Sequence, residues 1–95
     1  FEPGDMRWEA DRNRDPAGEP SLAEMTSIAI DLLARDPDGF FLMVEGGRID
    51  HGHHVGSAHH ALSDTIAFSE AVAVALQKTN PRETLVVVTA DHSHT

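Results

Sequence analysis

Two apolar runs, each leading directly into a cluster of acidic residues and histidines, constrain the fold of this 95-residue chain most strongly. Residues 40–44 (FFLMV) lead into 45-EGGRIDHGHH-54, and residues 84–90 (TLVVVTA) lead into 91-DHSH-94. A continuous apolar run bounded by turn residues is typical of a strand that is covered on both faces. We therefore expect two buried strands whose ends carry the polar clusters.

Helical patterns precede both runs. Ser21 and Glu24 have the spacing of a capping box, and apolar residues then recur at helical intervals over residues 21–35. A second amphipathic helix is expected over residues 59–78. The order helix, strand, helix, strand predicts an α/β fold, a fragment of a mainly parallel sheet flanked by helices. Ligands bind such sheets at the carboxyl ends of the strands, so we expect both clusters to form a metal site there.

The first 20 residues are expected to form a loop. They contain three prolines, two glycines and nine charged residues without a periodic apolar face. Loops of this length are usually functional or held in place by other groups. Trp8 is interpreted as the packing anchor of this loop, whereas His59 and His60, at the start of the second helix, are expected to be solvated.

Composition excludes several classes of function. A formal net charge of −9 argues against nucleic-acid binding, which requires a basic face. The chain contains no cysteine, so thiolate metal sites and disulfides are excluded within it. Its apolar runs are much shorter than the ~20 residues that span a bilayer. Because the chain begins with Phe1, we expect residues 1–95 to be part of a single domain of a longer protein.

The polar clusters contain candidate metal ligands. Asp50 and His54 lie four positions apart, so one helical turn places both on one face, and both are ordinary zinc donors. Asp91 and His92 are adjacent and could bind a second ion. Glu45 precedes two glycines and has no other acid beside it. A lone carboxylate favours a hard cation such as Mg²⁺. Two ions about 3.5–4 Å apart are suited to displacement at phosphorus.

Three further histidines, His51, His53 and His94, flank these residues. They either orient a ligand carboxylate or contact substrate, or they are simply exposed to solvent. An isolated Asp/His pair at helical spacing is also compatible with an ordinary surface. A non-catalytic zinc module is a further alternative, but structural zinc usually has four protein ligands, whereas each pair here supplies two.

The segments 44-VEGGRIDHGHH-54 and 88-VTADHSH-94 together resemble alkaline phosphatase, in the branch that includes the animal enzymes. The opening 1-FEPGDM-6 and the run 39-GFFLMV-44 extend the resemblance over nearly the whole chain. The resemblance implies hydrolysis of phosphate monoesters through a phosphoserine intermediate, at a site with two zinc ions and one magnesium ion. Small-molecule phosphate monoesters are then the expected substrates.

The resemblance also implies residue roles. Glu45 matches a magnesium ligand, Asp50 and His54 match two ligands of the first zinc, and Asp91 and His92 match two ligands of the second zinc. The nucleophilic serine of the family lies outside these residues, and no serine here stands in its sequence context. The fragment is therefore expected to supply metal ligands but to be inactive alone.

A calcium site is implied for residues 1–20. The Phe1 carbonyl, the Glu2 carboxylate and Glu19 match calcium ligands of the animal-type enzymes, although the family commonly has Asp at the position of Glu19 and a slightly shorter loop. Family membership further implies a homodimer that is secreted, periplasmic or surface-anchored.

Related families provide the alternatives. Phosphodiesterases, sulfatases and phosphoglycerate mutases of the same metal-dependent superfamily also place ligands at strand ends, and the nucleophile distinguishes them. A relative that has lost its nucleophile and only binds ligands is a third alternative.

Overall fold

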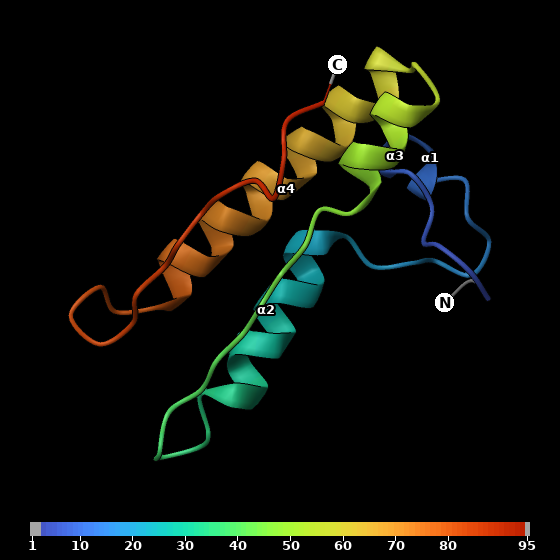
Figure 1. Cartoon of the computed structure of the whole chain (residues 1–95). Coiled ribbons are helices and arrows are strands. Elements are labelled where there is room, and N and C mark those ends of the chain that lie inside the picture. The colour runs from blue at the N-terminus through green and yellow to red at the C-terminus, as the bar shows by residue number, and fades with distance from the viewer. Residues whose placement is uncertain (1–2, 95) are drawn as a thin grey trace.

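One long helix organises the chain. The computed structural model describes residues 3–94, and within them the helices are α1 (Glu9–Arg12), α2 (Leu22–Leu33), α3 (Arg48–His54) and α4 (Ala58–Lys78). The helix α4 packs against each of the other three. Figure 1 shows α2 beside α4, with α1 and α3 gathered near the end at which α4 begins.

The helix α2 begins as the sequence predicts. The Ser21 hydroxyl accepts a hydrogen bond from the Glu24 amide at 3.1 Å, and the Glu24 carboxylate accepts one from the Ser21 amide at 2.7 Å. This reciprocal pair satisfies two backbone donors that the first helical turn would otherwise leave open. The predicted capping box is therefore confirmed, and the helix ends at Leu33, slightly earlier than expected.

Hydrogen bonds and an ion pair join α2 to the C-terminal end of α4. The Lys78 ammonium donates to the Asp31 carboxylate at 2.6 Å and to the Ser27 hydroxyl at 2.8 Å. Lys78 is also the last residue of α4, where a cation interacts favourably with the helix dipole. These contacts link α4 to α2.

The core is small and consists largely of small side chains. Its buried members are Thr26 and Ile30 on α2 and Ala61, Ala67 and Ala71 on α4. Short side chains at helical spacing let helix backbones approach closely. Several larger apolar residues of the two amphipathic helices are exposed: Ile28 and Leu32 on α2, and Leu62, Ile66 and Leu76 on α4.

The predicted α/β fold is wrong for this chain, because residues 3–94 contain no strand and no sheet. Residues 40–44 run back from the end of α2 toward α3, and residues 84–90 run back from the end of α4 (Figure 1). Neither run is buried on both faces. Phe41 is 88% exposed and Leu85 is 87% exposed.

The physical reason is that a strand requires a partner. Backbone N–H and C=O groups of a strand are satisfied by a neighbouring strand, and an apolar sequence does not by itself supply one. The β-propensity of Val, Phe and Thr reflects how these residues pack on a pleated surface rather than an intrinsic backbone preference. Here residues 40–44 run back along α2 and residues 84–90 run back along α4, so the two runs do not pair within the described residues.

The predicted loop over residues 1–20 contains one helical turn, α1. Its Arg12 guanidinium pairs with the Glu9 carboxylate at 2.9 Å, and the Glu9 amide donates to Asp64 of α4 at 3.3 Å. Burial raises the pKa of the Asp64 carboxyl. These contacts attach the start of the chain to α4. No helix within residues 3–94 has both the length and the apolarity to cross a bilayer.

Candidate metal centre

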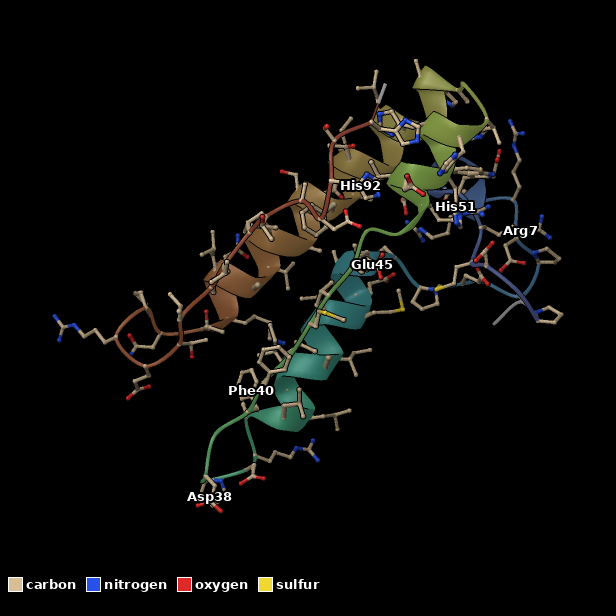
Figure 2. All side chains as sticks on the ribbon, in the orientation of Figure 1. Arg7, Asp38, Phe40, Glu45, His51 and His92 are labelled. Atoms are coloured by element: carbon tan, nitrogen blue, oxygen red, sulfur yellow. The ribbon has the colours of Figure 1, made fainter. Side chains whose placement is uncertain are left out.

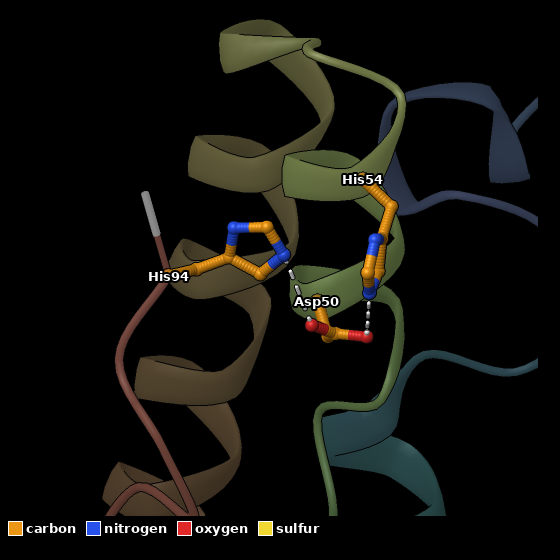
Figure 3. A group of neighbouring side chains, drawn as sticks. All are labelled: Asp50, His54 and His94. Atoms are coloured by element: carbon orange, nitrogen blue, oxygen red, sulfur yellow. Dashed lines mark ion pairs between the residues drawn. The ribbon is translucent and has the colours of Figure 1, made fainter.

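The centre of the candidate site is Asp50 on α3. Asp50 and His54 lie one helical turn apart, as their spacing predicts, and the Asp50 Oδ2 and His54 Nε2 atoms are 3.2 Å apart. Figure 3 shows the Asp50 carboxylate lying between His54 and His94, with one oxygen directed toward each ring. The His94 Nε2 atom is 3.5 Å from Asp50 Oδ1.

The C-terminal segment brings the second cluster to the first. His92 Nε2 lies 3.8 Å from Asp50 Oδ1 and 3.4 Å from Asp91 Oδ2. The two clusters therefore meet, as predicted, although no sheet brings them together within residues 3–94. The segment after residue 90 instead returns along α4 and ends beside α3 (Figure 1).

The donor set is of a kind that binds metal ions. One ligand atom each from Asp50, His54 and His94 lies within 4.8 Å of the other two. The two short distances join different Asp50 oxygens, Oδ2 to His54 Nε2 at 3.2 Å and Oδ1 to His94 Nε2 at 3.5 Å. Asp50 Oδ1 is also buried and has no hydrogen-bond partner among the described residues. A shared cation would remove the free-energy cost of that buried oxygen.

Backbone carbonyls orient two of the imidazoles. His53 Nδ1 lies 2.8 Å from the Ile49 carbonyl, and His92 Nδ1 lies 2.9 Å from the Ser93 carbonyl. A carbonyl only accepts, so each Nδ1 carries the proton, and a neutral ring then keeps its lone pair on Nε2. The pKa of His92 is raised, first by the hydrogen bond to Ser93 and then by the nearby Asp91 carboxylate.

The remaining predicted residues surround an open cleft beside α3. Glu45, Asp91, His92 and His94 all line it together with Asp50. The volume of this cleft is about 920 Å³. Figure 2 shows Glu45 just before α3 and His92 on the α4 side of it.

His51 also lines this cleft. Its Nδ1 atom lies 3.9 Å from the Asp5 carboxylate, on the side of the N-terminal segment (Figure 2). Glu45 and Asp91 are exposed, and Asp91 pairs with the adjacent His92. The roles of all these residues as ligands, or as groups that orient ligands, stay predictions.

The sequence-based predictions missed contacts that two histidines make. His94 Nε2 lies 3.5 Å from Asp50 Oδ1, and both its predicted orienting role and a direct ligand role are compatible with this geometry. The signal was its two-residue spacing from His92, which places both rings on one side of an extended segment. His60 was expected to be solvated, but it stacks on Trp8 with 4.4 Å between ring centroids and lies 3.2 Å from Asp11.

The predicted calcium ligands are described only in part. Phe1 and Glu2 lie outside the described residues. Glu19 is 5% exposed, and its carboxylate accepts a hydrogen bond from the Arg7 amide at 2.8 Å. Its own amide donates to Asp15 at 3.0 Å. A buried acid whose carboxylate accepts a backbone hydrogen bond fits an ordered loop, and the calcium assignment stays a prediction.

Comparison with known proteins identifies the family. The family model described as alkaline phosphatase matches residues 1–95. Over 94 residues, 99% of this chain, the sequence is 57% identical to the tissue-nonspecific isozyme of alkaline phosphatase from Gallus gallus and 53% identical to those from Rattus norvegicus and Homo sapiens. The chain covers 18% of the length of each of these relatives. Similarity on this scale, together with a family model that matches every residue, shows that the chain belongs to the alkaline phosphatase family.

Proposed function

We propose that this chain forms part of the metal centre of an enzyme that hydrolyses small phosphate monoesters through a phosphoserine intermediate. One observation supports the proposal most directly: the buried Asp50 Oδ1 atom lacks a hydrogen bond while His54, His92 and His94 surround the same carboxylate. A carboxylate among several imidazoles is the donor set of a zinc site.

The proposed ligands follow the family roles. Asp50 and His54 would hold one zinc ion, Asp91 and His92 a second, and Glu45 a magnesium ion. The bound ions would supply positive charge that stabilises the oxygens around a transferring phosphoryl group. Asp50 contributes by holding its two oxygens in fixed directions, because α3 and the C-terminal segment approach it from different sides (Figure 3).

The chain's own residues set the protonation of the site. The Ser93 carbonyl keeps a proton on His92 Nδ1, which leaves Nε2 directed toward Asp50 and Asp91. The nucleophilic serine would come from outside these residues. A homodimer that is secreted, periplasmic or surface-anchored is part of the same family-based proposal, as is the calcium site at Phe1, Glu2 and Glu19.

Single substitutions test the residue roles in the full-length protein that contains this sequence. Asp50→Ala and His92→Ala should each lower the zinc content and reduce turnover of an aryl phosphate by about a hundredfold or more, because a bound cation contributes several kcal/mol to transition-state stabilisation. Zinc content is measured by elemental analysis and turnover by release of the coloured phenol.

His59→Ala is the matched control. His59 is an exposed histidine at the start of α4, and its ring lies near His60 rather than near Asp50. This variant should keep both its zinc and its turnover. Equal losses in all three variants would show that the assignments are wrong.

A further inference from the structure

An aromatic residue near the start of the chain contacts both helices that flank the candidate site. The Arg48 guanidinium of α3 lies 3.9 Å from the centre of the Trp8 ring, and the His60 ring of α4 stacks on Trp8 at 4.4 Å. Two more contacts attach the same segment to α4: Glu9 donates to Asp64, and Asp11 lies 3.2 Å from His60. Trp8 therefore rests on α4 and presents its ring to α3.

Arg48 directs its charge toward the N-terminal segment. Its Nη1 atom lies 3.4 Å from the Asp5 carboxylate and 3.2 Å from His51 Nδ1. Its side chain is 24% exposed, and its Nε atom is buried without a hydrogen-bond partner among the described residues. A planar guanidinium that stacks on an indole and also pairs with a carboxylate is well suited to hold two segments together.

The helix α3 depends on such outside contacts. It has seven residues, no side-chain cap at Gly47 and a glycine in its centre at Gly52. A helix this short is unstable alone, and an interior glycine weakens it further. Arg48 also places a positive charge in the first turn, where the helix dipole disfavours it. Neighbouring groups must therefore compensate: α4 packs against α3, and Trp8 and Asp5 contact Arg48, its first residue.

We propose that Arg48 is a positioning residue for the metal centre: by stacking on Trp8 and pairing with Asp5, it fixes the start of α3 and so the place at which Asp50 meets His94. Asp50 follows Arg48 by two positions, so a shift at the start of α3 moves the carboxylate directly. The inference rests on the proposed role of Asp50 in holding zinc. It assigns the N-terminal segment a part in retaining the metal, although Arg48 itself contacts no candidate ligand carboxylate.

The rate of zinc loss from the loaded full-length protein tests this inference. We expect Arg48→Met and Trp8→Leu each to release zinc to a colorimetric chelator about tenfold faster than the unsubstituted protein, the size typical of losing a group that orients a ligand. The double variant should release zinc more slowly than the product of the two single effects, because both substitutions remove the shared Arg48–Trp8 contact. Excess zinc should restore turnover, since every proposed ligand is still present.

Conservative substitutions at Arg48 and Trp8 should have smaller effects on zinc release. Arg48→Lys keeps the charge beside Asp5 but loses the planar stack, and Trp8→Phe keeps a smaller ring, so both should release zinc about threefold faster. Arg14→Met is the matched control, because Arg14 is 85% exposed and pairs only loosely with Asp11 at 3.7 Å. It should release zinc at the unsubstituted rate.

Several results would overturn the inference. Unchanged zinc release in Arg48→Met and Trp8→Leu would do so, as would rates that multiply in the double variant or an equal effect of Arg14→Met. If circular dichroism shows that Arg48→Met and Trp8→Leu prevent folding, Arg48→Lys and Trp8→Phe provide the test. Zinc release from both at the rate of the unsubstituted protein would then overturn the inference. An unsubstituted protein that binds no zinc would instead refute the proposed function, and the inference with it.

Discussion

Gly52 sets how closely α3 approaches α4. A Cβ atom at this position would lie 2.7 Å from the Ala61 amide nitrogen and 2.9 Å from the Ala61 Cα atom. Real Cβ atoms do not come so close to backbone, and backbone cannot rotate away as a side chain can. The absence of a side chain therefore determines the distance between α4 and the helix that carries Asp50.

Two opposing effects decide the outcome of Gly52→Ala. Alanine in a helix gains about 1 kcal/mol over glycine, whereas overpacking costs about 1–3 kcal/mol. Because the clash is with backbone atoms, we expect the clash to dominate and the free energy of unfolding in urea to fall by about 1–2 kcal/mol. Gly4→Ala is the control, since a Cβ at Gly4 meets no atom within 4 Å. A Gly52→Ala protein at least as stable as the original would contradict this packing.

Part of the candidate site could be predicted from the sequence. The approach of His54 to Asp50 follows from helical spacing, which is a local property. The approach of His94 to the same carboxylate could not be derived in this way, because it depends on how the chain returns after α4. The packing role of Trp8 was expected, but its partners Arg48 and His60 were not, since no local pattern encodes a contact across 40 or more positions.

The helix α2 owes its N-terminal boundary to the capping box. Ser21→Ala removes the acceptor for the Glu24 amide and should lower the free energy of unfolding by about 1 kcal/mol. Hydrogen exchange of the Glu24 amide, measured by mass spectrometry of the peptide that contains it, should become faster. The hydroxyl of Ser63 instead donates to the His59 carbonyl within α4. Ser63→Ala should therefore be neutral or slightly stabilising, and an equal loss in both variants would argue against the cap.

The long helices were predictable because their signals are local. Capping residues and periodic apolar positions located α2 and α4 to within a few residues. The runs over residues 40–44 and 84–90 were misjudged, because an apolar run specifies an extended chain but not the partner that makes it a strand. The exposure of several large apolar side chains has a related reason. Because α2 buries Thr26 and Ile30 and α4 buries alanines, Ile28 and Ile66 lie on faces that no described element covers.

Three distant stretches of the chain converge near the start of α4. The N-terminal segment supplies Trp8, α3 supplies Asp50 and His54, and the C-terminal segment supplies His92 and His94. None of these stretches forms a site alone. The function proposed here therefore depends on the arrangement of the whole chain, with α4 as the surface on which the three stretches meet (Figure 1).

The proposed function is tested most directly by metal-dependent hydrolysis of an aryl phosphate at alkaline pH, with the full-length protein that contains this sequence. An aryl sulfate and a phosphodiester are run in parallel, before and after chelation, and zinc and magnesium are then added back separately and together. We expect the monoester to be the preferred substrate, chelation to abolish its turnover, and full activity to return only with both ions. Turnover that survives chelation, or zinc binding without monoester turnover, would contradict the proposed metal-dependent phosphatase.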